Sequence, residues 1–222
     1  PFDEPSLEML MELEIDAIKV ASFDIGNLPF LNRIESKGLP VIMSTGGANL
    51  EIIQDSIDVL NTSEIALLHC VSEYPCPASR LSLPKIMEYQ KKFPKVTVGS
   101  SDHFSGILSG PIAYMLGARV FEKHVTHNRA AKGTDHSFSL EKRGLENFIR
   151  DLNRTQEMLK NDQKPDLGNE PVFKKLGKSV TAKDHISKGT KIQMDMLSGR
   201  IFSNVEIPVR LSKKVIGKVA KK

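Results

Sequence analysis

The sequence predicts an α/β fold: the carboxyl-terminal part of a (β/α)8 TIM barrel, with about five β/α units, followed by a small β-rich domain. Three observations lead to this prediction. Over residues 1–160, short apolar or β-branched runs alternate with longer amphipathic stretches. A polar segment then interrupts the pattern, and we expect a linker at 161–173. Residues 174–222 contain short alternating runs separated by turns, as at 179–182 and 191–194.

Five strands are expected from these apolar runs, at 18–22, 41–44, 65–70, 96–100 and 119–125. Apolar residues spaced by three and four predict six helices, at about 7–13, 28–34, 50–60, 86–93, 107–116 and 140–159. Asn49 suits a helix cap, Pro84 suits a first turn, and Gly38 and Gly117 follow helix ends. Turns are expected at 187–189 and at Asn204.

Five parallel strands do not close a barrel of eight, so an open doubly wound sheet is the alternative. The chain starts at Pro1 and runs directly into a helical pattern, which favours the later part of a barrel within a longer protein.

Composition sets broad limits on function. The chain has 222 residues, of which 40% are hydrophobic and 26% are charged, and its formal net charge is +4. This charge is too small to indicate a nucleic acid or a membrane surface as partner. No apolar run approaches the roughly 20 residues of a membrane span, and no secretory signal opens the chain, so we expect a cytoplasmic protein. Cys70 and Cys76 lack partners at zinc-type spacing and are expected to be free thiols.

Two histidines lie at the carboxyl ends of predicted strands. His103 comes after the fourth strand, and His124 lies at the end of the fifth. If these strands are neighbours, both imidazoles emerge at the same carboxyl edge and can share a divalent cation, with water or substrate in the open positions. Imidazole and oxygen ligands suit Mn²⁺, Mg²⁺ or Zn²⁺. The alternative is that each of these two histidines only caps its strand and hydrogen-bonds a loop. His69, inside an apolar run, is expected to hydrogen-bond inside the barrel rather than to bind a metal.

A lysine lies inside the first predicted strand. Because a buried ammonium is costly unless it is paired, Lys19 needs an anion. Ser22, Ser44 and Ser101 would supply hydroxyl groups near it, which predicts a phosphate site. An ion pair of Lys19 with Asp24 or Glu122 is the alternative. In the turn at 132–136, Asp135 either brings a carboxylate over the site or fixes the turn.

Five motifs, at 18–22, 41–46, 67–75, 99–103 and 121–124, occur in the order found in the sialic acid synthases, which the chain resembles. Residues 179–189 resemble the small SAF (antifreeze-like, β-clip-like) domain of these enzymes. The resemblance implies condensation of phosphoenolpyruvate with N-acetylmannosamine or a related 2-acylamino sugar. The products would be a nine-carbon 2-keto sugar acid and phosphate.

The resemblance also implies roles for twelve residues. Phosphoenolpyruvate would be held by Lys19, Ser22, Ser44, Ser101 and Ser72, the last at a position where the family can carry asparagine. His103 and His124 would bind Mn²⁺ or Mg²⁺. Glu122 would act as acid/base. Asp24, at a position where the family commonly carries glutamate, is the second catalytic candidate and would position the sugar together with Tyr74 and Asp135. Arg200 is the nearest arginine to the sugar-contacting position of the SAF domain.

The resemblance implies a homodimer in which the SAF domain covers the partner's site. It also implies that strands preceding Pro1 complete the barrel, so the chain by itself is expected to be inactive or nearly so. Two other functions stay open: a metal-dependent sugar aldolase or epimerase that does not use phosphoenolpyruvate, and a non-catalytic carbohydrate-binding or assembly module. The sugar is also open among mannosamine, a 6-phosphate and 6-deoxy diamino sugars.

Overall fold

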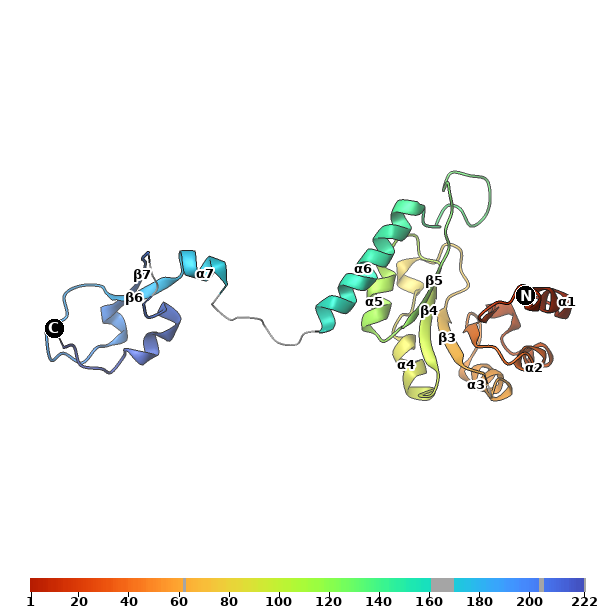
Figure 1. Ribbon diagram of the computed structural model, residues 1–222, viewed down its shortest axis with the longest axis horizontal. Helices are drawn as coiled ribbons and strands as arrows, with labels where there is room; N and C mark the ends of the chain where they lie inside the picture. Colours follow the sequence, from red (N-terminus) through yellow and green to blue (C-terminus); the bar gives the residue numbers. More distant parts are fainter. Residues whose placement is uncertain (62, 161–169, 204–205, 222) are drawn as a thin grey trace. The chain divides into compact units, whose positions relative to one another are not determined.

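The computed structural model of the chain describes residues 1–61, 63–160, 170–203 and 206–221 (Figure 1). The chain divides into two compact units, 1–160 and 161–222, each with its own sheet. The larger unit contains all of the predicted strand-end motifs. Within the described residues, no helix combines the length and apolar character that crossing a bilayer requires.

The larger unit is built on one parallel sheet whose strands follow one another in sequence order. Every strand pairs with the next one in the sequence, and a helix connects the two. Because such crossover connections are right-handed, the helices lie on the same face of the sheet. This is the arrangement of part of a (β/α)8 barrel. The five expected strands are confirmed as β1 (Ile18–Val20), β2 (Val41–Ser44), β3 (Ile65–Cys70), β4 (Thr97–Asp102) and β5 (Val120–Lys123).

The six expected helices of this unit are confirmed too. Asn49 accepts a hydrogen bond from the Ile52 amide and caps its helix as predicted, and Gly38 and Gly117 adopt positive φ at helix ends. Short 3₁₀ turns lie at Ser22–Asp24 and Ala78–Arg80. The helices are α1 (Glu4–Met11), α2 (Leu28–Glu35), α3 (Leu50–Val59), α4 (Lys85–Lys92), α5 (Ser109–Met115) and α6 (Lys142–Lys160).

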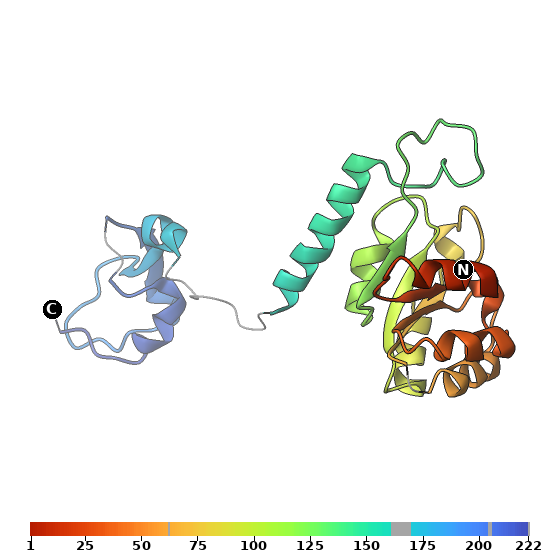
Figure 2. The ribbon, with the colours of Figure 1, turned by 45° about the vertical axis from the view of Figure 1, so that its right-hand side comes forward.

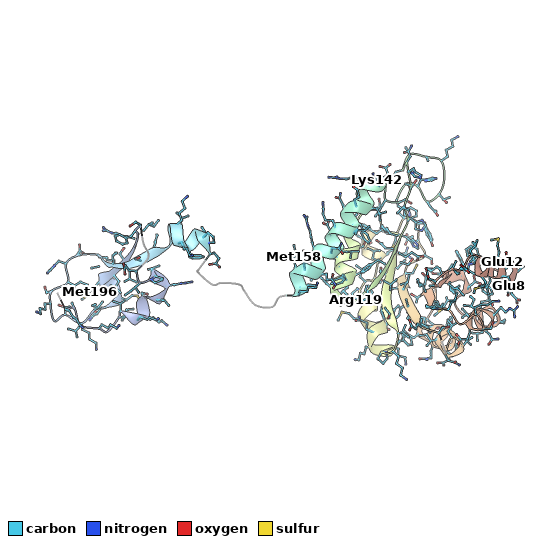
Figure 3. All side chains as sticks on the ribbon, viewed as in Figure 1. Glu8, Glu12, Arg119, Lys142, Met158 and Met196 are labelled. Atoms are coloured by element: carbon cyan, nitrogen blue, oxygen red, sulfur yellow. The ribbon has the colours of Figure 1, made fainter. Side chains whose placement is uncertain are left out.

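Neighbouring helices are joined by specific contacts. Glu8 of α1 is labelled in Figure 3. Its carboxylate lies 3.2 Å from the guanidinium of Arg33, in α2, and 2.6 Å from the ammonium of Lys37, which follows α2. Helix α6 lies beside α5 in Figure 1 and again in Figure 2. A methyl group at Gly110 would lie 2.3 Å from the Phe148 ring, so a glycine is needed where these two helices approach each other.

Alternation along the strands separates the core from the site. Ile18, Val20, Val41 and Met43 are fully or almost fully buried and belong to the apolar core on the helix-covered face. The residues that alternate with them along each strand face the other side of the sheet. On that side Cys70 of β3 pairs with Ser101 of β4, and Ser101 pairs with Glu122 of β5, so these three side chains lie side by side near the carboxyl edge.

Some expected strand ends are wrong. β1 stops at Val20 because the chain turns at Ala21, whose carbonyl accepts a hydrogen bond from the Asp24 amide. β4 extends two residues beyond the prediction, since its end pairs with β5 as far as Asp102. β5 ends at Lys123, and Val125 makes only an isolated bridge to Leu140.

The smaller unit has an antiparallel pair of strands, β6 (Lys178–Ala182) and β7 (Leu197–Ile201). The expected run at 179–182 is thus a strand, whereas 191–194 contributes only an isolated bridge from Lys191 to Val219. The turn at 187–189 is present, with the Thr190 amide donating to the Ser187 carbonyl. Short 3₁₀ segments lie at Met194–Met196 and Val209–Lys214.

Helix α7 (Pro171–Leu176) begins inside the segment that we expected to be a linker. Its Pro at the first helical position is favourable because that position needs no amide donor. The rest of the expected linker, at 161–169, and the turn expected at Asn204 lie outside the described residues.

His69 is buried and its Nε2 lies 2.7 Å from the Leu81 carbonyl oxygen, so it does hydrogen-bond internally. The expected place of this bond, inside the barrel, is wrong, because strand alternation puts His69 on the helix-covered side of β3, beside Tyr89 of α4. Its Nδ1 is buried and has no partner among the described residues. Burial lowers the pKa of His69. The folded chain therefore resists protonation, whereas the unfolded chain takes up a proton below the ordinary histidine pKa of about 6.5.

Because the pKa of His69 is lower in the folded chain than in the unfolded chain, we predict that the protein loses stability on acidification. The effect is absent well above pH ~6.5 and grows as the pH falls from that value towards the folded-state pKa. The free energy of unfolding should fall more steeply for the wild type than for His69→Gln, by up to about 1.4 kcal/mol per pH unit. Urea titrations between pH 7 and 5 measure it, with the exposed His127→Gln as control. Equal slopes for wild type and His69→Gln would contradict the assignment.

Candidate functional site

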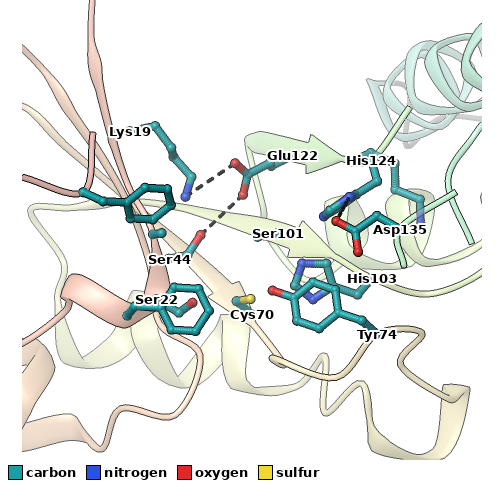
Figure 4. Close-up of a pocket in the computed structure, with 14 residues that line it drawn as sticks. Lys19, Ser22, Ser44, Cys70, Tyr74, Ser101, His103, Glu122, His124 and Asp135 are labelled. Atoms are coloured by element: carbon teal, nitrogen blue, oxygen red, sulfur yellow. Dashed lines mark hydrogen bonds and ion pairs between the residues drawn. The ribbon is translucent and has the colours of Figure 1, made fainter. Parts of the chain in front are cut away.

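A cavity of about 560 Å³ lies at the carboxyl ends of the strands in the larger unit (Figure 4). Nine of the twelve residues that the sequence singled out line it, although they are spread over more than 100 positions of the chain. They are Lys19, Ser22, Ser44, Tyr74, Ser101, His103, Glu122, His124 and Asp135. The structure thus brings together most of the predicted site.

Lys19 and Glu122 meet across this cavity. The Lys19 ammonium lies 3.4 Å from the Glu122 carboxylate, and the Ser44 hydroxyl lies 3.4 Å from the other carboxylate oxygen (Figure 4). The alternative in which Lys19 pairs with Glu122 is therefore present as a contact. Their side chains are 33% and 40% exposed, and a pair so accessible to solvent contributes little to stability. Both groups stay available to a ligand.

A second polar cluster surrounds Gly46, directly after β2. The Gly46 amide donates a 3.0 Å hydrogen bond to the Ser22 hydroxyl. A methyl group on Gly46 would lie 2.0 Å from the Ser72 hydroxyl and 2.7 Å from that of Ser22. Gly46 thus allows both hydroxyl groups to approach the backbone closely, and it places Ser72 beside Ser22, although Ser72 does not itself line the cavity among the described residues.

His103 and His124 lie side by side, with ring centroids 5.3 Å apart and planes inclined at 73°. His103 Nδ1 lies 2.7 Å from the Val71 carbonyl oxygen, which makes Nδ1 the donor and leaves Nε2 with its lone pair. Burial lowers the pKa of His103, and the neighbouring His124 lowers it further, although the Val71 hydrogen bond opposes both. These effects favour the neutral imidazole that metal binding requires.

Aromatic and acidic side chains complete this end of the cavity. The Tyr74 ring lies 4.0 Å from the His103 ring between centroids, and burial raises the pKa of the Tyr74 hydroxyl. Asp135, in the loop after β5, lies 3.7 Å from His124 Nδ1. That loop is held by Arg129, which donates to the Ser137 carbonyl and, at 3.0 Å, to the Ser105 hydroxyl. Asp135 therefore does reach the site, as one of its two interpretations required.

The donors present fit a divalent cation of the open, catalytic kind. Two neighbouring imidazoles, one of them oriented by a backbone carbonyl, lie within a cavity that also offers the Asp135 carboxylate. No group of three or more His, Cys, Asp or Glu side chains in the described ranges is arranged to hold a metal ion alone. Water or substrate oxygens would have to supply the remaining ligands.

Two predicted residues lie elsewhere. Asp24 is buried in the 3₁₀ turn after β1, where its carboxylate accepts a 2.9 Å hydrogen bond from the Asn27 amide group. It does not line the cavity, within the part of the chain that the structure describes. Arg200 belongs to β7 of the smaller unit, and its side chain is exposed. Their roles stay predictions.

Sequence reasoning missed several lining residues, namely Phe2, Ala21, Phe23, Cys70 and Lys123. Phe23 is 78% exposed, so no pattern of apolar burial points to it. The signal that could have found it is its position between Ser22 and Asp24. Cys70 could have been found from strand alternation, because it pairs with Ser101 of the neighbouring strand and so faces the same side of the sheet.

The sequence model of the NeuB family matches residues 1–164. N-acetylneuraminate-9-phosphate synthase of Homo sapiens is 36% identical over 90% of this chain and 56% of its own length. N,N'-diacetyllegionaminic acid synthase of Campylobacter jejuni is 34% identical over 100% of this chain and 68% of its own length.

A solved structure is similar as well. The N-acetylneuraminic acid (sialic acid) synthetase of Leptospira borgpetersenii, determined in complex with citrate, superimposes with a TM-score of 0.70 at 34% identity. The match covers 75% of this chain and 59% of that one. The chain therefore spans little more than half the length of the human relative and of this solved structure.

Proposed function

The chain belongs to the NeuB family, and from this we propose that the protein condenses phosphoenolpyruvate with N-acetylmannosamine or a related 2-acylamino sugar. The methylene carbon of phosphoenolpyruvate forms a bond to the aldehyde carbon of the open-chain sugar, and the aldehyde oxygen takes up a proton. Water then adds to the carbon of phosphoenolpyruvate that carries the phosphate, and the bond from that carbon to the phosphate oxygen breaks. The products are a nine-carbon 2-keto sugar acid and inorganic phosphate. One observation carries the proposal: Lys19, three serines and two histidines line one cavity.

Phosphoenolpyruvate would bind at the end of the cavity that Lys19 occupies. Its phosphate and carboxylate groups need a cation and hydrogen-bond donors, which Lys19, Ser22, Ser44 and Ser101 supply. Ser72, next to Ser22, would support the same group. Glu122 lies within reach of Lys19 and Ser44, and we assign it proton transfer during the loss of phosphate.

The sugar would bind at the other end, near Tyr74 and Asp135, and we keep Asp24 as a further candidate for catalysis or sugar positioning. His103 and His124 would hold Mn²⁺ or Mg²⁺. That ion would supply Lewis acid polarisation of the sugar aldehyde. The Val71 carbonyl accepts a hydrogen bond from His103 Nδ1, which leaves the Nε2 lone pair of His103 for the ion. The Tyr74 ring packs against the His103 ring.

We further propose that the smaller unit is an SAF domain, that the protein is a homodimer in which this domain covers the partner's site, and that Arg200 contacts the sugar there. The two-stranded sheet β6–β7 supports a small β-rich domain. A cytoplasmic location likewise stays a prediction.

The test uses the complete protein that carries this chain. It is incubated with Mn²⁺, phosphoenolpyruvate and, separately, N-acetylmannosamine, its 6-phosphate or a 6-deoxy diacetamido hexose, and phosphate release is followed. We expect release with at least one sugar and none without sugar. Release with no sugar of the panel would contradict the proposal. Cleavage or formation of a sugar acid without phosphoenolpyruvate would identify an aldolase instead.

A substitution at Gly46 tests where phosphoenolpyruvate binds. In Gly46→Ala, the new methyl group must displace the hydroxyl groups of Ser22 and Ser72. Losing one hydrogen bond to a charged group costs about 1.5–3 kcal/mol, so the KM for phosphoenolpyruvate should rise by about tenfold or more, with the KM for the sugar little changed.

The matched control for Gly46→Ala is Gly144→Ala in α6, where the nearest atom to the new methyl is a Leu140 methyl carbon at 3.3 Å. Steady-state kinetics of both variants decide the matter. A Gly46→Ala enzyme with an unchanged KM for phosphoenolpyruvate would place the phosphate elsewhere.

A further inference from the structure

The ends of β4 and β5 are joined by a buried ion pair. Asp102 and Lys123 are register partners and the last residues of their strands. The Lys123 ammonium lies 2.6 Å from the Asp102 carboxylate, and the two side chains are only 3% and 6% exposed. Each is followed directly by one of the two neighbouring histidines, His103 and His124.

Further hydrogen bonds fix this pair from both sides. The Ser109 hydroxyl of α5 donates to the same oxygen of Asp102, and the Phe104 amide donates to the other at 2.8 Å. The Lys123 ammonium also donates to the Phe104 carbonyl. Both charges are thereby satisfied, and the segment that contains His103 is anchored before and after the histidine.

The ion pair offers no chemistry to the cavity itself. Strand alternation places Ser101 and Glu122 on the cavity face, and therefore Asp102 and Lys123 on the face that α5 covers. Lys123 borders the cavity, but its ammonium is directed to Asp102. Any effect on the site must pass through the backbone to the adjacent histidines.

We propose that the Asp102–Lys123 ion pair positions His103 and His124 and so sets the affinity of the site for a divalent cation. This inference rests on the metal site of the proposed function. An apolar pair could fill the same volume, but it would not fix the strand ends at one separation, as charged hydrogen bonds with defined geometry do. The 5.3 Å spacing of the imidazole rings depends on that separation.

The experiment is a titration of the complete protein with Mn²⁺ alone, followed by electron paramagnetic resonance of the free ion. Lys123→Met removes the cation, and Ser109→Ala removes one hydrogen bond while keeping the pair. Altered support of metal ligands typically weakens binding 10–100-fold. We expect at least about tenfold weaker Mn²⁺ binding in Lys123→Met and a smaller loss in Ser109→Ala.

Leu60→Ala is the control, because Leu60 is fully buried at the end of α3 and belongs to neither β4 nor β5. Its truncation destabilises the fold while leaving both charges of the ion pair in place. Circular dichroism establishes that each variant is folded at the assay temperature. Leu60→Ala should bind Mn²⁺ as the wild type does. An equal weakening in Leu60→Ala would show that lost stability, rather than positioning, is responsible, and would overturn the inference.

The remaining outcomes separate this inference from the proposed function. A folded Lys123→Met variant with wild-type affinity overturns the inference alone. If Lys123→Met does not fold, Ser109→Ala decides, and wild-type affinity in that variant overturns the inference equally. Wild-type protein that binds no Mn²⁺ overturns the proposed metal site, and the inference with it.

Discussion

Replacing His103 by alanine is expected to lower kcat for sugar acid formation by about 10²–10⁴-fold while the protein stays folded. The reason is the loss of a ligand to the ion that would supply Lewis acid stabilisation, an effect of several kcal/mol, at roughly tenfold per 1.4 kcal/mol. The structural cost is the loss of one hydrogen bond, to Val71, worth about 1 kcal/mol, and of the packing of this buried ring against Tyr74.

Initial rates at saturating substrates, with increasing Mn²⁺, measure this effect in the complete protein. His127→Ala is the matched control, because His127 is exposed in the loop after β5 and does not line the cavity. It should retain wild-type kcat. If kcat of the His103→Ala enzyme is within a few-fold of the wild-type value, His103 does not hold a metal ion that catalysis needs. Sugar binding that survives in His103→Ala and His124→Ala, with no turnover in any form, would favour a non-catalytic binding module.

A methyl group at Gly99 is expected to unfold or severely destabilise the larger unit. The added carbon of Gly99→Ala would lie 2.3 Å from the Val120 carbonyl oxygen and 2.4 Å from a Leu68 methyl carbon. Leu68 can rotate, but the oxygen belongs to the backbone of β5, so β4 and β5 would have to separate. Overpacking typically costs about 1–3 kcal/mol, and a backbone clash should reach or exceed the upper value.

Urea denaturation of the chain measures the effect. Gly38→Ala is a useful comparison, because it places a methyl group in open space and is strained only by its φ of +68°. Gly99→Ala should lose clearly more stability than Gly38→Ala. Equal losses would mean that the sheet around Gly99 adapts more easily than the geometry indicates.

Much of the fold could be predicted because local signals and tertiary structure agree. Short apolar or β-branched runs located all five strands, and Asn49 marked a helix start that the structure confirms. Strand ends were less predictable, since β4 extends to Asp102 through its pairing with β5, which depends on a distant segment. The bridge between Val125 and Leu140 is of the same kind.

The site was predictable where chemistry is unusual for its surroundings. A lysine in an apolar strand and histidines directly after strands stand out, and Lys19, His103 and His124 do share a cavity. Phe23 and Cys70 were missed because an aromatic residue and a thiol at strand ends have ordinary structural explanations. The Asp102–Lys123 pair needed the register, because the two residues are 21 positions apart in sequence.

The most direct measurement of the central claim is mass spectrometry of the product that the complete protein forms from fully ¹³C-labelled phosphoenolpyruvate, an acylamino sugar and Mn²⁺. A sugar acid that carries all three labelled carbons, formed in equimolar amount with phosphate, is the predicted result. Phosphate released with labelled pyruvate and unchanged sugar, or an unlabelled sugar acid, would contradict the claim that this cavity joins phosphoenolpyruvate to a sugar.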